Sequence, residues 1–492
     1  VTVATANGDL IIVDDITTDS NLSAVRNVIF QGAGASTFNA AGAQSITATS
    51  GAIRDTNGAV LAKSGGANLI LDAGSAIGVN AGNALGVALT GGSALEAVSG
   101  GDVFVTSAAS LVVERLDTGA GADSVDIRTT GASATLTLSG PYTDVGSDNF
   151  TLVAARDLNF DTNPLTVATL DASFGQSGTS SDFDIDQVVA ATTPGAFTLS
   201  GGAGSADRID ASSLAGALTF TLTALNAGSV SGGVDVGAFS GIESLLGGSG
   251  SDTLAGSLTY TVSGADSGTA SSLSGTWASI ENLTGSAAAN TFNLATGGSL
   301  SGAIDGLGGN DTLSYSARAT AITIDFATLT APSINGFTNL ETFVGGSGSG
   351  DTVVGADNPS NWAVTGANAG TIDDSTVGAP GSVEVNFSAF ENLQGGSAAD
   401  AVSVAAGGAM SGAIDGGGGI DTFAFATRGS AVTVNLQNGT AADSSSTFAN
   451  FAAFENFTGS AAGTDKLVGR NLKTDWRLTA SGAGSLDDTP SG

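Results

Sequence analysis

A long internal repeat constrains this chain more than any other sequence feature. Residues 280–313 read IENLTGSAAANTFNLATGGSLSGAIDGLGGNDTL, and residues 390–423 read FENLQGGSAADAVSVAAGGAMSGAIDGGGGIDTF. The second copy begins 110 residues after the first (390 − 280), and the two align without a gap. Copies of one unit fold by stacking on each other, and a repeated element is a poor catalytic centre. We therefore expect a repeat architecture.

The composition favours short strands joined by tight turns. Gly accounts for 74 of the 492 residues, and 41% of the residues are hydrophobic. This fraction is too high for a disordered chain, and the Gly residues do not follow the period of collagen. Small residues between clusters of Val, Ile, Leu and Phe suit turns between strands, whereas the residues that favour long helices are scarce.

A shorter unit recurs in residues 1–115, where alternating strand patterns are followed by small-residue turns. Successive strands begin 16–23 residues apart, so we expect a parallel β-solenoid with about 20 residues per coil. Alternation predicts one common inward row, made of Ile46, Leu69, Val87 and Val103. Residues 116–215 are less regular, and residues 216–492 alternate two longer modules. We interpret the three parts as one continuous solenoid.

The charge balance excludes several classes of partner. Asp and Glu number 46 against 13 Lys and Arg, which gives a formal net charge of −33. Such a surface repels nucleic acid and anionic lipid, and divalent cations are its natural counter-ions. The chain has neither Cys nor His, so disulfides, thiolate metal sites and the commonest general base are absent.

No apolar run reaches the ~18 residues of a membrane-spanning helix. We therefore expect no direct membrane insertion by this segment. The chain starts at Val1 within a strand-like pattern, without a signal peptide. We interpret it as a portion of a longer protein, cut at both ends.

Gly-Asp turns in the repeat predict a calcium site. Residues 247–254 read GGSGSDTL, and similar turns place Asp311 and Asp421 after Gly-rich loops that begin with Asp305 and Asp415. Ca²⁺ takes six to eight oxygen ligands, and such a turn offers carbonyl and carboxylate oxygens. Asp252 resembles the aspartate of the calcium-binding nonapeptide of repeats-in-toxin proteins. In the alternative interpretation, each aspartate caps its own turn through a hydrogen bond and binds no metal.

Two further sets of residues recur at fixed places in the modules. One glutamate precedes each module-ending turn, and we expect these carboxylates to accept backbone N–H groups at solenoid corners. Glycosidase chemistry needs two carboxylates at one site, and these are tens of residues apart. The glutamates are Glu243, Glu281, Glu341, Glu391 and Glu455. The aromatic residues Tyr260, Trp362 and Trp476 open one module type, and we expect them in the core rather than in a sugar-stacking row.

The modules resemble the repeats of giant β-strand-repeat adhesins of Gram-negative bacteria, and residues 1–115 resemble the coils of filamentous-haemagglutinin-type exoproteins. The resemblance implies a right-handed parallel β-helix, forming an elongated rod, that is exported to the bacterial cell surface.

We therefore expect a non-enzymatic structural or adhesive segment. Its expected partners are other cell surfaces, glycans or further copies of itself, assembled into a filament. Two alternatives stay open: a passive spacer that displays a binding domain outside this sequence, and a polysaccharide-degrading β-helix enzyme. A lyase acting on acidic sugars would need a basic groove, which 13 basic residues do not suggest.

Overall fold

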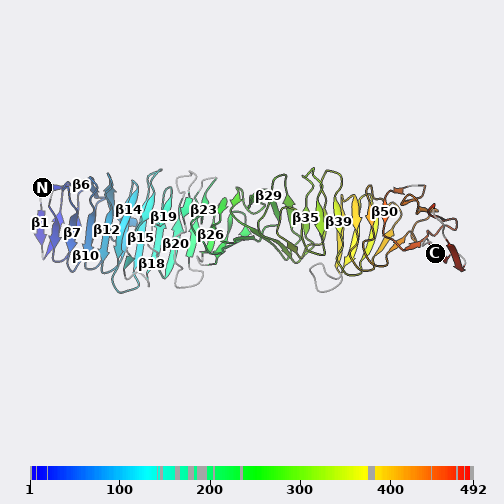
Figure 1. Cartoon of the computed structure of the whole chain (residues 1–492). Coiled ribbons are helices and arrows are strands. Elements are labelled where there is room, and N and C mark those ends of the chain that lie inside the picture. The colour runs from blue at the N-terminus through cyan, green and yellow to red at the C-terminus, as the bar shows by residue number, and fades with distance from the viewer. Residues whose placement is uncertain are drawn as a thin grey trace. The chain divides into compact units, whose positions relative to one another are not determined.

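The computed structural model describes residues 3–487 except 7, 19, 141, 144–147, 161–166, 175–181, 185–196, 203–205, 233–235, 375–382, 445, 472–474 and 481–482. Within these residues the fold is all-β, with one short 3-10 turn at Ala81–Asn83 and no α-helix. Parallel strands of successive coils stack into long sheets, which confirms the predicted parallel β-solenoid class (Figure 1). In the described part of the chain, no helix is long and apolar enough to span a membrane.

The chain forms two compact units. The first comprises Val1–Ala255 and Ser271–Ile280, and the second comprises Gly256–Ala270 and Glu281–Gly492. Each unit is described separately below. The boundaries predicted at residues 115 and 215 stay predictions.

Two long sheets and one short sheet build the first unit. One long sheet contains β3 (Thr17–Thr18), β6 (Ala35–Phe38), β9 (Val60–Lys63), β11 (Leu85–Leu89), β13 (Val103–Ser107), β15 (Ser124–Thr129), β18 (Asn149–Val153), β20 (Thr169–Ser173), β22 (Phe197–Ser200), β26 (Val236–Ser240), β25 (Ala227–Ser231), β24 (Thr219–Ala224) and β28 (Thr253–Ala255).

The other long sheet contains β4 (Leu22–Ala24), β7 (Gln44–Ala48), β10 (Leu69–Ala73), β12 (Leu95–Ser99), β14 (Leu111–Asp117), β16 (Leu136–Leu138), β17 (Tyr142–Thr143), β19 (Leu158–Phe160), β21 (Asp182–Asp184), β23 (Arg208–Asp210), β27 (Ser244–Leu246) and β31 (Trp277–Ala278). The short sheet contains β1 (Val3–Ala6), β2 (Asp9–Ile12), β5 (Val28–Phe30) and β8 (Ile53–Asp55).

The inward row predicted for the first unit is wrong in one respect. Ile46, Leu69, Val87 and Val103 are all buried, as alternation predicts. Ile46 and Leu69, however, lie in the sheet of β7 and β10, whereas Val87 and Val103 lie in the sheet of β11 and β13. Leu69 pairs with Leu95, so this coil uses 26 residues (95 − 69) rather than about 20. Consecutive strand patterns belong to different faces of one coil, and the sequence spacing alone merged them into one row.

The second unit is built from one long sheet and several shorter ones. The long sheet contains β30 (Ser267–Ala270), β29 (Thr259–Gly264), β33 (Thr291–Leu294), β35 (Thr312–Ser314), β38 (Thr342–Val344), β42 (Val383–Ser388), β41 (Ala369–Asp374), β40 (Asn361–Gly366), β44 (Ala401–Val404), β46 (Thr422–Ala424) and β51 (Asn456–Thr458).

The shorter sheets pair β32 (Asn282–Ser286), β34 (Ile304–Leu307) and β37 (Phe337–Thr338); β36 (Thr323–Asp325), β39 (Thr352–Val354), β43 (Asn392–Gln394), β45 (Ile414–Asp415) and β50 (Phe451–Ala452); β47 (Thr433–Asn435), β48 (Thr440–Ala442), β49 (Thr447–Phe448) and β52 (Lys466–Val468); and β53 (Asp475–Ala480) with β54 (Ala483–Asp487).

Antiparallel hairpins interrupt the parallel ladders in the aromatic-to-Gly module, in which a Gly follows the opening aromatic residue by eight positions, as Gly370 follows Trp362. In β40–β41, Trp362 is the second residue of the first strand and Val364 pairs with Gly370. A Cβ on Gly370 would lie 2.1 Å from the Ala363 carbonyl oxygen and 2.8 Å from the Phe387 ring, so only Gly fits there. The same arrangement occurs in β24–β25, β29–β30 and β53–β54. A purely parallel solenoid was predicted, and these hairpins are an addition to it.

Inward and outward positions differ sharply in the second unit. Phe292 and Leu313 point into the core and are fully buried. One position earlier in these strands, Thr291 pairs with Thr259 on one neighbouring strand and with Thr312 on the other. All three threonines are partly exposed. Apolar side chains on one face and β-branched polar ones on the other are what a half-buried strand favours.

Candidate functional site

The aspartates of the Gly-Ser turns join neighbouring coils. The Asp252 carboxylate is fully buried; its Oδ2 accepts the Gly248 N–H at 2.6 Å and its Oδ1 accepts the Leu218 N–H at 2.8 Å. Gly248 belongs to the same turn, whereas Leu218 precedes the paired strand β24 of a neighbouring coil. The same two contacts recur at Asp351, with Gly346 and Ile322, and at Asp400, with Gly396 and Ser360. Each aspartate therefore accepts one N–H group in its own turn and one from the preceding coil.

The repeated glutamates take up the backbone N–H groups of these corner aspartates. The Glu391 Oε2 accepts the Asp351 N–H at 3.0 Å, for example. The equivalent contacts, each at 2.8 Å, are Glu243 with Asp207, Glu341 with Asp311 and Glu455 with Asp421. Four of the five predicted glutamates thus have the structural role expected from the sequence. Burial raises the pKa of the Glu243 carboxyl, and the nearby Asp207 carboxylate adds to this rise.

Asparagine side chains next to two glutamates add hydrogen bonds between coils. The Asn282 Oδ1 accepts the Ala303 N–H at 3.0 Å, and the Asn392 Oδ1 accepts the Ala413 N–H at 2.8 Å. The Glu-Asn pair therefore holds adjacent coils at the same corner.

The loops with two predicted metal ligands are built differently. Asp305 accepts the Leu307 N–H at 3.0 Å, and Asp415 accepts the Gly417 N–H at 3.0 Å. Leu307 and Gly417 lie four residues before Asp311 and Asp421. This is the place that Gly248 takes relative to Asp252, where its N–H group is donated to the corner aspartate. Asp305 and Asp415 thus cap their own turns, and the N–H groups of Leu307 and Gly417 are donated to them rather than to Asp311 and Asp421.

Asp311 therefore has a hydrogen-bond partner at only one of its two carboxylate oxygens. Its Oδ1 accepts the Asn290 N–H at 2.6 Å, whereas its buried Oδ2 has no hydrogen-bond partner within the described residues. Burial raises the pKa of the Asp311 carboxyl to about 6, and the Glu341 and Asp305 carboxylates contribute. Burial likewise raises the pKa of Asp421.

The predicted calcium ligands do not converge on one point. Asp252 uses both oxygens for backbone N–H groups, Asp305 and Asp415 cap turns, and Asp311 keeps one oxygen unpaired. Where the chain is described, no three acidic side chains are grouped closely enough to hold a metal ion. The residues fit the self-capped interpretation better at Asp252 than at Asp311, and calcium binding stays a prediction.

The aromatic residues lie in the core. Tyr260 is fully buried, stacks on Phe292 with ring centroids 5.1 Å apart, and donates its hydroxyl proton to the Thr284 carbonyl at 2.7 Å. Trp362 is buried against Phe387. The core interpretation is therefore confirmed for these two rings. Trp476 lies in β53, and its side chain is outside the described residues.

Two buried arginines in the second unit were not singled out from the sequence. Arg318 and Arg428 lie 110 residues apart, at equivalent places of the repeat, and are 9% and 2% exposed. Arg428 forms an ion pair with buried Asp443, with Nε and Oδ2 2.9 Å apart. Each arginine also donates to a serine hydroxyl and a glycine carbonyl: Arg318 to Ser333 at 2.9 Å and Gly298 at 2.5 Å, and Arg428 to Ser446 at 2.6 Å and Gly408 at 3.4 Å. Two basic residues at one repeat position, in a chain with only 13, are the sequence signal for this site.

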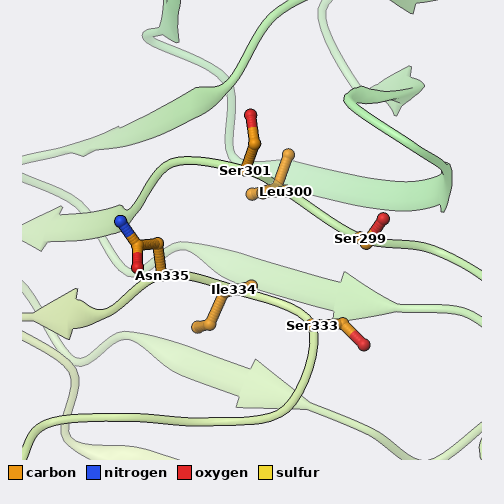
Figure 2. A pocket seen from close by; sticks show the side chains of 6 residues that line it. All are labelled: Ser299, Leu300, Ser301, Ser333, Ile334 and Asn335. Carbon is orange, nitrogen blue, oxygen red and sulfur yellow. The ribbon is translucent and has the colours of Figure 1, made fainter.

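A pocket of about 350 Å³, open to solvent, includes Ser333, the hydrogen-bond partner of Arg318, in its lining. Residues 299–301 and 333–335 line it as two neighbouring segments, joined by the Leu300 N–H bond to the Ser333 carbonyl at 2.8 Å (Figure 2). The hydroxyls of Ser299 and Ser333 lie at one end, and Ser301 and Asn335 at the other.

Comparison of the chain with protein-family models, with curated proteins and with solved structures finds no match to any of the three.

Proposed function

We propose that the chain is a non-enzymatic structural and adhesive segment of a secreted bacterial surface protein. The observation that supports this proposal is the use of the repeated acids. The carboxylates that recur in each module accept backbone N–H groups between coils. A carboxylate engaged in this way stabilises stacking, and each added repeat extends the structure without adding a reaction site.

The partners that suit this segment are other cell surfaces, glycans and copies of itself. A net charge of −33 opposes close approach to anionic polymers, and salt or divalent cations would reduce that repulsion. The outward Thr rows of the second unit are uncharged and offer hydroxyl groups to a neutral or mixed glycan. Attachment then rests on many weak contacts, which multiply when repeats are linked.

Excision of one compound repeat tests this proposal. Removing residues 281–390 joins Ile280 to Glu391, and Glu391 is the equivalent of Glu281. Ser279 and Ala389, each two residues before the repeated glutamate, share the left-handed backbone conformation with φ of 52° and 60°. The join therefore preserves the local geometry.

Beads coated with the full or the excised chain would be tested for retention on bacterial cells under flow. An adhesive repeat predicts that retention falls with the number of repeats. Unchanged retention by a folded, excised chain would contradict adhesion by the repeat and would favour the passive spacer.

A further inference from the structure

The long sheet of the second unit carries a row of outward-facing residues without any charge. Strand pairing continues this row across ten strands, from β29 to β51, including the antiparallel strands β42, β41 and β40. Each member is at least partly exposed, whereas inward-facing neighbours such as Phe292 and Phe387 are buried. The members of this neutral row are Thr259, Thr291, Thr312, Thr342, Asn386, Thr371, Ala363, Ser403, Ala424 and Thr458.

The rows on either side of the neutral row are almost free of charge as well, and we call the three rows together the neutral strip. One side row consists of Thr261, Asn293, Ser314, Val344, Ser388 and Ala369. The other consists of Asn361, Ala401, Thr422 and Asn456, continued by Asp373 and Glu384. Asp373 is the one charged side chain that the structure describes in the strip, and it lies at the margin.

The other sheets place acids at outward positions. Asp171 in β20 and Glu96 in β12 do so in the first unit, and Asp325 in β36 does so in the second. A chain with a net charge of −33 thus keeps one broad strip of strand surface nearly free of charge.

Repulsion between like charges decides which surfaces of two copies come together. Two copies with a net charge of −33 each repel, and burying an unpaired carboxylate is costly wherever acids line a contact. Contact through the neutral strip avoids that cost. Depletion of charged residues is also the compositional signal that marks the centre of a protein–protein interface.

The neutral strip is large enough for a stable contact. Neighbouring strands lie about 4.8 Å apart, so the steps from β29 to β51 make the neutral row about 43 Å long. Successive outward positions on one strand are about 6.6 Å apart, so three rows are about 20 Å wide. The product is on the order of 800 Å² per copy, which is the area that each partner contributes to a standard protein–protein interface.

A glycan fits the neutral strip less well than a second copy does. The rings of these strands, such as Tyr260, Phe292 and Trp362, are buried and give a sugar no platform on the outer face. Small ligands favour concave sites, and the pocket lined by residues 299–301 and 333–335 lies outside the strip.

We propose that two copies of this chain associate through the neutral strip, with sheet packed against sheet. A two-fold axis places the strip of one copy against the same strip of the other, which is the commonest form of contact in oligomers. The side chains are short, chiefly Thr, Ser, Ala and Asn, so the sheets approach to the usual distance of about 10 Å. This inference deepens the proposed function, because it assigns a surface to self-association, and it rests on that function only for its biological setting.

Salt dependence distinguishes this contact from one made by ion pairs. Added salt screens the repulsion between two acidic copies, and the neutral row contains no ion pair that salt would weaken. Dimer formation should therefore strengthen as NaCl is raised from about 0.05 M to about 0.5 M.

Sedimentation equilibrium of the full chain at both salt concentrations tests the proposal. We expect a monomer–dimer equilibrium whose dissociation constant falls as salt is added. Asn386→Asp puts a carboxylate near the middle of the neutral row with almost no change in shape. It should raise the dissociation constant about tenfold or more, because like charges across a contact oppose binding. Asn386→Ala adds no charge and should leave the dissociation constant close to that of the parent.

Asn159→Asp is the matched control. It makes the same change of charge at a partly exposed position of β19 in the first unit, outside the strip, and should leave the dimer intact. Thermal unfolding checks that each variant is folded. If Asn386→Asp does not fold, Asn456→Asp makes the same conservative change at an exposed position of the strip.

Two results would overturn the proposal: a parent chain that stays monomeric at the higher salt concentration, and an equal loss of dimer in Asn386→Asp and Asn159→Asp. If the parent is monomeric and Asn386→Asp lowers bead retention, the strip contacts the cell surface, and self-association is again refuted. A monomeric parent whose retention still falls on repeat excision refutes this inference alone. A dimeric parent whose retention is unchanged on excision contradicts the adhesive role alone.

Discussion

Buried aspartates hold the coils together at the scale of single residues. Because Asp252 accepts the Gly248 and Leu218 N–H groups, Asp252→Ala leaves both donors without an acceptor. Each unpaired buried donor costs about 1–3 kcal/mol, so the variant should lose roughly 2–6 kcal/mol of unfolding free energy. Asp305→Ala, at a partly exposed turn, should lose about 1 kcal/mol or less. Urea denaturation measures both, and an equal loss in the two variants would contradict the account of Asp252.

The pKa of Asp311 predicts a pH dependence of stability. Its pKa is about 6 in the folded chain against an ordinary value of 3.8. The folded state therefore binds this proton more tightly, and the contribution of Asp311 to stability falls as pH rises from 3.8 to about 6. Asp311→Asn cannot ionise, so its stability relative to the parent should increase across this window and stay constant above it.

The matched control for Asp311→Asn is Asp351→Asn. Both Asp351 oxygens accept N–H groups, so its amide variant should be less stable than the parent at neutral pH. Denaturation at pH 4.5 and pH 7.5 tests the pair. A stability difference between Asp311→Asn and the parent that does not change with pH would contradict the raised pKa.

At the scale of elements, the β24–β25 and β40–β41 hairpins each depend on one closely packed glycine, Gly228 and Gly370. In Gly370→Ala, the added methyl meets the Ala363 carbonyl and the Phe387 ring, so β40 and β41 must separate. We expect a loss on the order of 1–3 kcal/mol, as for overpacking elsewhere in a core. Gly429→Ala is the control, because a Cβ there meets no atom within 4 Å. Thermal unfolding of the two variants should differ, and equal melting temperatures would contradict the hairpin packing.

How much of these elements the sequence predicts depends on the range of the contacts. Alternation and turn composition predict strands and buried residues such as Ile46 and Leu69, because both signals are local. The face on which each strand lies depends on coil closure, about 25 residues away, so the single inward row was wrong. The aromatic-to-Gly interval of eight residues was visible, but its meaning as a hairpin needs the pairing of Val364 with Gly370.

For the candidate site, too, the parts that depend on local sequence were predicted and the parts that depend on distant contacts were not. The corner role of the glutamates was predicted because it follows from their place before a turn. The site at Arg318 was missed because its partners, Gly298 and Ser333, are 20 and 15 residues away, and burial of an arginine cannot be deduced from composition.

At the scale of the whole molecule, the charge of −33 predicts a response to cations. If the Gly-Asp turns bind Ca²⁺, millimolar Ca²⁺ should raise the melting temperature beyond the effect of Na⁺ at equal ionic strength, because a ligand that binds only the folded state stabilises it. Replacing Asp252, Asp311 and Asp421 together with Ala should remove that excess. Equal effects of the two cations would leave the turns self-capped and contradict the calcium assignment.

The central claim is that the 110-residue repeat is an interchangeable stacking unit whose acids hold coils together. The most direct test is the folding of the chain that lacks residues 281–390, followed by far-ultraviolet circular dichroism during thermal unfolding. We predict the same β-type signal per residue as in the parent and a cooperative transition, since Glu391 takes the place of Glu281 at the join. Loss of the β signal, or a transition without cooperativity, would contradict the claim.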